Sequence, residues 1–528
     1  MSIVSMANTP KEEFSNTTGI TETITCHSNV LEQMVKDVGK KTQPDEEATP
    51  RDPRVGAVTN IDLDVVNPKQ HIGLFGAVTF GIGSMIGSGI FISPKASLAL
   101  AGSQGMSLVI WSLCGLIAFM MGLVYAELGT IIPRSGGDFV YIRKGFGPVP
   151  AFLAVWVKPL FVQTSATAVL SLVFADYLLP LVYGACPPPN VLRKLIGALL
   201  IITIAISNIV SPKLGVFVQM ISTVAKTLAL IIIAITGIVF ILKGRTENLT
   251  NAFDGSASEV TSYSLAIYSC AFAYGGYIRI GEIADEIINP QKNIPRALMI
   301  SITLVTVIYV VVNTSYFVLL PKQEFLGSPA VAYDWALKCI PSVAIFVPIS
   351  VMISVYGSNN GGCFGSARVM FAAARAEQYP EAISFLHAKD STPIISLVLF
   401  HIICIIMLIP GDIQQLINFL SFMSSFVTLL SSLSLLRLKW LSRKEPKKTG
   451  FRTNIIFPIV TSLIAVFLIV APFINSPRIE FLYSASFVFG GYLLYIPFVH
   501  FGWKLPGTDR ITVFLQLLCN SCPTEKLA

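Results

Sequence analysis

The stretch from His71 to Pro94, HIGLFGAVTFGIGSMIGSGIFISP, constrains the fold more than any other part of the chain. It is apolar and long enough to cross a bilayer as a helix, which takes about 20 residues. Between residues 81 and 89 it nevertheless contains four glycines, each of which weakens a helix by about 1 kcal/mol relative to alanine: Gly81, Gly83, Gly87 and Gly89. Backbone groups released at such a break must be buried in protein or line a cavity. Two interpretations are therefore open, a ligand site at a broken helix or close helix packing through small residues.

The composition indicates a membrane protein with many spans. Of the 528 residues, 53% are hydrophobic and only 13% are charged, whereas soluble domains carry about 25% charged residues. Eleven more apolar segments follow the first, so we predict an all-α polytopic membrane protein with twelve transmembrane helices. These segments lie near residues 107–132, 149–183, 193–211, 214–242, 263–288, 296–320, 341–374, 393–410, 412–438, 455–475 and 480–503.

The segments outside the spans set the predicted orientation. Residues 1–70 are polar and lack apolar periodicity, so we predict a disordered cytosolic N-terminal tail before a transporter domain at 71–503. Residues 504–528 are predicted to be a cytosolic C-terminal tail. Basic residues follow spans two and ten on the side of the N-terminal tail, and the positive-inside rule makes that side cytosolic. These residues are Arg134, Arg143, Lys144, Arg437, Lys439, Arg443, Lys444, Lys447, Lys448 and Arg452.

The sixth span repeats the feature of the first. It carries Gly275, Gly276 and Gly281 near its middle. Two glycine-interrupted spans, five spans apart, predict two five-helix halves of inverted topology with the ligand between them. Repeat one would cover about 71–242, repeat two about 263–438, and spans eleven and twelve about 455–503. This pattern favours the ligand-site interpretation.

No feature of the sequence indicates enzyme chemistry. The nine cysteines lack metal-site spacing, and no nucleophile–base pair stands out. The net charge of +7 is concentrated in loops beside the spans, which does not require nucleic acid. We therefore expect no catalytic residues, no metal and no cofactor.

Several motifs resemble the light chains of the heteromeric amino acid transporters, in the amino acid–polyamine–organocation superfamily. They are GSGIF (87–91), SGGDFVYIRKGFGPVPAF (135–152), FAYGG (272–276) and DEIINP (285–290). NGGCF (360–364), IPGDI (409–413) and VFLIVAP (466–472) are closest to the b(0,+)-type branch. The resemblance covers roughly residues 70 to 524. It implies a leucine-transporter-like fold, with spans one and six unwound at mid-membrane, and sodium-independent exchange at the plasma membrane.

The resemblance also implies where the substrate binds. The amino acid carboxylate would meet the N–H groups of Gly87, Ser88 and Gly89, and the ammonium would meet carbonyls near Phe272 and Ala273. Phe272 would also act as a lid. Opposite half-helix ends then face opposite charges, which suits a zwitterion. The full set of expected substrate-binding residues is Met85, Gly87, Ser88, Gly89, Phe272, Ala273 and Gly275.

Lys226 and Cys186 carry two further expectations. A lysine within a span costs at least about 2.5–3.5 kcal/mol, so Lys226 in span five needs a partner unless it snorkels. The resemblance implies that its ammonium stands where sodium-coupled relatives hold sodium. Cys186, in the loop between spans three and four, matches the cysteine that joins such light chains to a single-span glycoprotein heavy chain. An internal Cys186–Cys339 disulfide is the alternative.

Departures from the resemblance bear on specificity. Gly275 stands where the b(0,+) branch carries an aspartate, and Arg279 stands where relatives are uncharged. Arg279 could pair with Glu282 or Glu286, or it could recruit acidic substrates or cystine.

Spans three and ten also depart from the relatives. Gln163 replaces an arginine, Lys158 appears earlier in span three, and Ser424 and Ser425 replace larger side chains, which could widen the pocket. We predict an antiporter of neutral L-amino acids. The alternatives are b(0,+)-type exchange of cationic amino acids and cystine for neutral ones, or a non-transporting amino acid sensor.

Overall fold

The computed structural model describes residues 72–87, 89–133, 136–184, 186, 188–210, 212–388, 392–442, 450–474, 479–503 and 506–523. The predicted N-terminal tail and Ser88 of the predicted carboxylate site lie outside these ranges. Helices make up nearly all of the described part, as the all-α prediction requires. Two short strands, β1 (Leu386–His387) and β2 (Ser521–Cys522), pair antiparallel.

Helices up to the end of the fifth predicted span follow the apolar segments closely. They are α2 (Leu74–Met85), α3 (Gly89–Ala101), α4 (Gln104–Ile131), α5 (Asp138–Phe146), α6 (Pro148–Val157), the π-helical turn η1 (Lys158–Val162), α7 (Gln163–Tyr183), α8 (Asn190–Val210) and α9 (Pro212–Leu242).

The remaining helices include several short ones. They are η2 (Glu247–Leu249), α10 (Val260–Tyr274), η3 (Gly275–Glu286), α11 (Pro290–Leu319), α12 (Lys322–Gly327), α13 (Val331–Cys339), η4 (Pro341–Val343), α14 (Phe346–Arg375), η5 (Glu381–Ser384), α15 (Ile394–Met407), α16 (Ile413–Leu441), α17 (Ile456–Val470), η7 (Ala471–Phe473), α18 (Ile479–Leu494), η8 (Tyr495–His500) and α19 (Thr508–Leu518).

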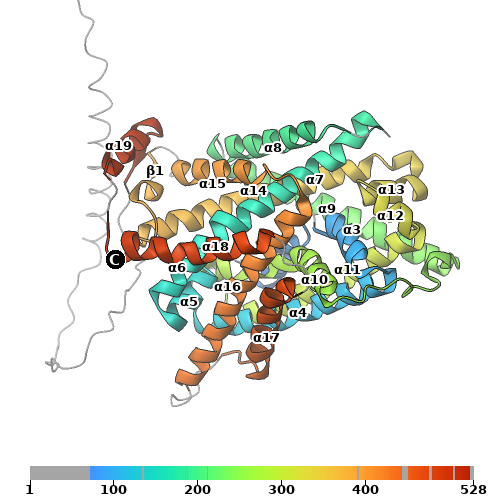
Figure 1. Ribbon diagram of the computed structural model, residues 1–528, viewed down its shortest axis with the longest axis horizontal. Helices are drawn as coiled ribbons and strands as arrows, with labels where there is room; N and C mark the ends of the chain where they lie inside the picture. Colours follow the sequence, from blue (N-terminus) through green and yellow to red (C-terminus); the bar gives the residue numbers. More distant parts are fainter. Residues whose placement is uncertain are drawn as a thin grey trace, which may run out of the picture.

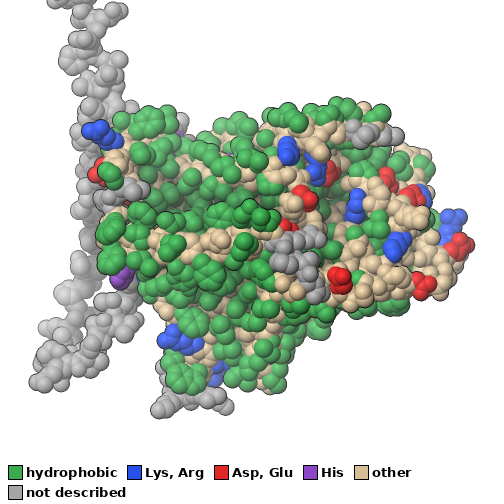
Figure 2. Space-filling view, in the orientation of Figure 1, with side chains coloured by type: hydrophobic (Ala, Val, Ile, Leu, Met, Phe, Trp, Pro, Cys, Tyr) green, Lys and Arg blue, Asp and Glu red, His purple; other side chains and the backbone are tan. Residues whose placement is uncertain are grey.

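Apolar surface identifies this as a membrane fold. Within the described ranges, eight helical segments are long and apolar enough to cross a membrane, or nine when α2 and α3, bent by 48°, count as one span. Figure 2 shows hydrophobic side chains over most of the body, whereas charged side chains gather mainly toward one end. Such a continuous apolar surface is stable against lipid and not against water.

The long helices lie side by side around the two broken spans. In Figure 1, α8, α14 and α15 run nearly parallel, with α12 and α13 at one end of the molecule and α5, β1 and α19 at the other. Tight pairs in the interior are α4 with α11, α9 with α14, and α7 with α14.

Spans one and six are antiparallel. Ile72, just before α2, donates its N–H to Glu286 O (3.0 Å), and Ile288 donates to Ile72 O (2.9 Å). The start of α2 and the end of η3 therefore lie at the same end of the molecule. Along the spans, α2 packs against η3 and α3 packs against α10, so each half of span one contacts one half of span six.

Candidate functional site

Both glycine-interrupted spans are broken in the structure. In span one, α2 ends at Met85 and α3 begins at Gly89. In span six, the α-helical hydrogen-bonding pattern ends at Tyr274 and a tighter 3₁₀ helix begins at Gly275. The glycine density that weakens each helix thus coincides with an observed change of backbone geometry.

The two breaks lie directly against each other. A Cβ on Gly89 would lie 2.6 Å from Ala273 Cα, and a Cβ on Gly276 would collide with the backbone of Ser84. The start of each second half-helix therefore rests on the last turn of the other span's first half. Only glycine permits this approach, because any side chain would push the two backbones apart.

Lys226 donates to a carbonyl that loses its helical hydrogen-bond partner at the break in span one. In a continuous helix the Gly83 carbonyl would accept from the Gly87 N–H, but that N–H donates to Met85 O instead, at 2.7 Å. Lys226 Nζ, on α9, donates to Gly83 O at 2.6 Å. Its side chain is fully buried at 0% exposure, so it does not snorkel. A cation at the C-terminal end of α2 also matches the helix dipole.

Tyr309 is a residue at the breaks that the sequence did not predict. From α11, its hydroxyl lies 2.7 Å from Met85 O and 3.1 Å from Ala273 O, so it donates toward the last turn of both first half-helices. Its ring is fully buried and packs edge-on against Trp111 and Tyr274, with ring centroids 5.5 and 5.1 Å away. One tyrosine thus ties the two breaks together.

We expect Tyr309→Phe to slow transport without preventing folding. Removing the hydroxyl leaves two buried carbonyls without this donor, and an unsatisfied buried acceptor costs roughly 1–3 kcal/mol. The ring packing is retained, so the protein should still fold. The lost donor should lower the initial uptake rate at least about fivefold. The rate is measured per surface-exposed transporter, with Tyr483→Phe on the exposed face of α18 as the matched control. Equal rates in the two variants would contradict a role for the Tyr309 hydroxyl.

The other predicted substrate-binding residues have different surroundings. Ala273 is buried and Phe272 is half-buried, whereas Gly275 is exposed and has open space beside its Cα. In α16, which packs against α10, Ser425 is buried and donates to Ser421 O at 2.8 Å, next to half-buried Ser424.

Arg279 contacts span three. Its Nη2 donates to Gln163 Oε1 at 3.1 Å, and its guanidinium lies beside Gly362 and Gly365 of α14. The Glu282 side chain lies outside the described part of the chain. The two unusual residues of spans six and three, Arg279 and Gln163, are therefore direct partners.

Lys158 belongs to a second polar cluster, beyond the helix breaks. In the π-helical turn η1 it forms an ion pair with buried Asp138 of α5. The same carboxylate accepts from Tyr125 Oη (2.5 Å) and Ser431 Oγ (2.8 Å). Four helical elements are thereby joined around one buried carboxylate, which gives Lys158 a structural role.

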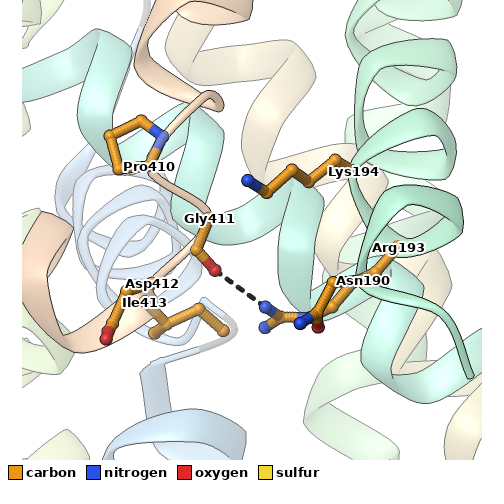
Figure 3. A pocket seen from close by; sticks show the side chains of 7 residues that line it. All are labelled: Asn190, Arg193, Lys194, Pro410, Gly411, Asp412 and Ile413. Atoms are coloured by element: carbon orange, nitrogen blue, oxygen red, sulfur yellow. Dashed lines mark hydrogen bonds between the residues drawn. The ribbon is translucent and has the colours of Figure 1, made fainter.

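A cavity of about 430 Å³ opens between the start of α8 and the turn before α16 (Figure 3). Both of its cations are engaged in structural contacts. Arg193 donates to Gly411 O (2.8 Å) and pairs with Asp176, while Lys194 donates to Ile409 O (2.7 Å). None of the predicted substrate-binding residues lines the cavity, and its basic groups join the start of α8 to α7 and to the turn before α16.

Comparison with known proteins identifies the family. The amino acid permease family matches residues 72–497. The b(0,+)-type amino acid transporter 1 of Mus musculus is 36% identical, over 88% of this chain and 96% of the relative. The Homo sapiens cystine/glutamate transporter is 36% identical, over 87% and 92%. The Homo sapiens large neutral amino acids transporter small subunit 2 is 37% identical, over 78% and 77%.

These relatives confirm the resemblance to light chains of heteromeric amino acid transporters. The family match likewise confirms that the chain is a membrane transporter of amino acids and not an enzyme. The chain belongs to the amino acid permease family.

Proposed function

We propose that the chain is the light subunit of a sodium-independent amino acid exchanger of the plasma membrane, working by alternating access. The observation that carries this proposal is the mutual packing of the two helix breaks, with Lys226 and Tyr309 donating to the carbonyls beside them. Transporters use such paired discontinuous helices to bind charged ends of a substrate. A buried lysine at the end of α2 supplies a fixed positive charge, so no sodium ion is needed there.

The proposed architecture has twelve spans, with repeats at about 71–242 and 263–438 related by inversion and both termini cytosolic. The packing at the breaks supports this symmetry. Gly89 rests on Ala273, and Gly276 rests on Ser84, so corresponding positions of the two spans make reciprocal contacts. An odd number of spans per repeat gives the antiparallel arrangement of spans one and six.

The proposed substrate site follows the sequence prediction. The ammonium would bind the carbonyls near Phe272 and Ala273, and the carboxylate would bind N–H groups at the start of α3, with Met85 and Gly275 beside them. The Gly87 N–H donates to Met85 O in this structure, so the turn must open for that group to bind a carboxylate. Substrate binding would therefore change the backbone at the break in span one.

Neutral L-amino acids are the proposed substrates. No carboxylate stands at Gly275 to compensate a cationic side chain, and a buried uncompensated charge is costly. Arg279 is held beside Gln163 and the glycines of α14, which favours a structural role over recruitment of acidic substrates. The second candidate is b(0,+)-type exchange, since the b(0,+)-type relative matches 88% of this chain and the large neutral relative 78%, at nearly equal identity.

A trans-stimulated uptake panel tests the function. Cells or proteoliposomes loaded with leucine would be offered labelled leucine, arginine, cystine and glutamate, with and without a heavy chain. We expect leucine uptake to rise with internal leucine and to be equal in sodium and choline media. Arginine exchange at the leucine rate would establish the b(0,+)-type alternative. Binding of amino acids without any exchange would identify a sensor.

Gly275→Asp should extend transport to arginine. The open space beside Gly275 accommodates an aspartate side chain without displacing a neighbour, and its charge would offset a cationic side chain in the site. Arginine uptake should rise from background, whereas Gly275→Asn, of the same size but neutral, should leave it there. An equal gain in both variants would attribute the effect to shape and not charge.

Cys186 is the proposed attachment point for a heavy chain. It is exposed, whereas Cys339 is half-buried, and burial raises the pKa of the Cys339 thiol to about 12, which disfavours the reactive thiolate. In cells that express a heavy chain, non-reducing gels should show a large complex that Cys186→Ser lacks and Cys339→Ser retains. A covalent complex that survives Cys186→Ser would point to Cys339 instead.

A further inference from the structure

A second cavity, of about 400 Å³, lies beside the first turns of α11. One wall is formed by the face of α11 that carries Lys292, Arg296 and Met299, and the opposite wall by Gly450 and Phe451, with Gln291 and Pro295 completing the lining. It lies at the end of the molecule where Ile288 bonds to Ile72, which is the cytosolic end in the proposed orientation. It is separate from the helix breaks.

Hydrogen bonds anchor one wall of the cavity. Thr130 of α4 donates to Phe451 O at 3.3 Å. Two residues on, the Thr453 N–H donates to the buried carboxylate of Glu127 at 2.9 Å, and Lys439 pairs with the same carboxylate at 2.7 Å. The segment that leads into α17 is therefore held against α4 and α16 at Phe451 and Thr453.

Unlike Lys439, the cations at the cavity have no ion-pair partner among the described residues. Lys292 and Arg296 are exposed, and neither forms an ion pair or side-chain hydrogen bond with the rest of the chain as far as it is described. Arg452, next to Phe451, is exposed in the same way. Lys292 and Arg296 are four residues apart, so they project from one helix face, and the N-terminal end of α11 adds positive potential.

The same face of α11 becomes apolar one turn further on. Ile300, Leu304 and Val307 continue it at helical spacing, with 41, 46 and 57% of their side-chain surfaces exposed. In α17, which follows the lining residues Gly450 and Phe451 in the chain, Ile456, Ile459 and Leu463 are exposed. Both helices pack against α4, so each carries an apolar stripe that would face the lipid beside the basic cavity.

We propose that this cavity binds the head group of an anionic phospholipid of the cytosolic leaflet, with its acyl chains on the stripes of α11 and α17. The positive charges of Lys292 and Arg296 complement the negative head group, and the exposed apolar residues of α11 and α17 can contact the acyl chains. A soluble anion would use only the first of these features. The proposal rests on the orientation given under the proposed function, but not on which amino acid is transported.

Native mass spectrometry of the purified full-length protein tests the proposal, with bilayers of phosphatidylcholine containing phosphatidylserine as the lipid source. The wild type should retain phosphatidylserine over phosphatidylcholine. Removing both charges in Lys292→Gln/Arg296→Gln should weaken that preference about 30-fold, since each basic residue near an anionic surface contributes roughly fivefold. The control Lys243→Gln/Arg245→Gln removes the same charge after the end of α9 and should leave the preference unchanged.

Two further arms make the result decisive. The exchange of cations in Lys292→Arg/Arg296→Lys keeps both charges and should retain the preference, which separates loss of charge from loss of fold. Millimolar inorganic phosphate should not displace the lipid, because phosphate cannot use the apolar stripes. An unchanged preference in the glutamine variant, or displacement by phosphate alone, would overturn the proposal. Transport measurements are not needed for either outcome, so a failed exchanger assignment remains distinguishable.

Discussion

Gly89→Val is expected to abolish transport while the protein still reaches the membrane. Even the first carbon of a side chain would lie 2.6 Å from Ala273 Cα, and 3.3 Å from the Ala273 backbone N. A flexible side chain can move away from such an overlap, but a backbone atom at a helix end cannot without separating the two breaks. Valine adds two more methyl groups at the same place. We expect exchange of labelled leucine to fall at least about 100-fold, which corresponds to roughly 3 kcal/mol.

The comparison with other glycines makes this test specific. Gly490 lies in the apolar helix α18, and a Cβ added there would have no neighbouring atom within 4 Å, so Gly490→Val should transport normally. Surface biotinylation would confirm that both variants reach the plasma membrane in similar amounts. Normal exchange by Gly89→Val would mean that the breaks need not approach each other during transport, and the proposed site would have to be abandoned.

Apolar segment length alone was sufficient to predict most of the helices. The predicted segments 107–132 and 193–211 correspond to α4 (Gln104–Ile131) and α8 (Asn190–Val210). The reason is physical, since a bilayer demands helices of a minimum length and apolar character. Short elements that need not cross a bilayer escape this constraint. The region predicted as a C-terminal tail therefore contains α19 and strand β2, which the apolar segments did not indicate.

Partners across the fold were harder to predict than the elements themselves. Glycines marked both breaks, because glycine weakens a helix wherever the helix lies. Tyr309 gave no such signal, since a tyrosine in an apolar span resembles any core aromatic until its hydroxyl is found beside Met85 O and Ala273 O. For the same reason, Gln163 of span three was not predicted as a partner of Arg279, although the two side chains share a hydrogen bond.

Lys226→Ala is the second variant from which we expect complete loss of transport. The substitution removes the donor to Gly83 O, and the Gly87 N–H cannot replace it because it already donates to Met85 O. A buried carbonyl at the C-terminal end of α2 would lose its partner, at a cost of about 1–3 kcal/mol, and the helix end would lose the positive charge that its dipole favours.

Charge and volume can be separated by comparing two substitutions at this position. Lys226→Met keeps most of the side-chain volume but lacks the charge and the donor, so it should also fail to transport. It should be more stable to heating than Lys226→Ala, because it leaves a smaller cavity. Lys243→Ala removes an exposed lysine after the end of α9 and should behave as wild type. If Lys226→Met exchanges leucine at the wild-type rate, Lys226 serves only to fill space. A wild type that requires sodium would instead show that the lysine does not substitute for a bound cation, even if both variants are inactive.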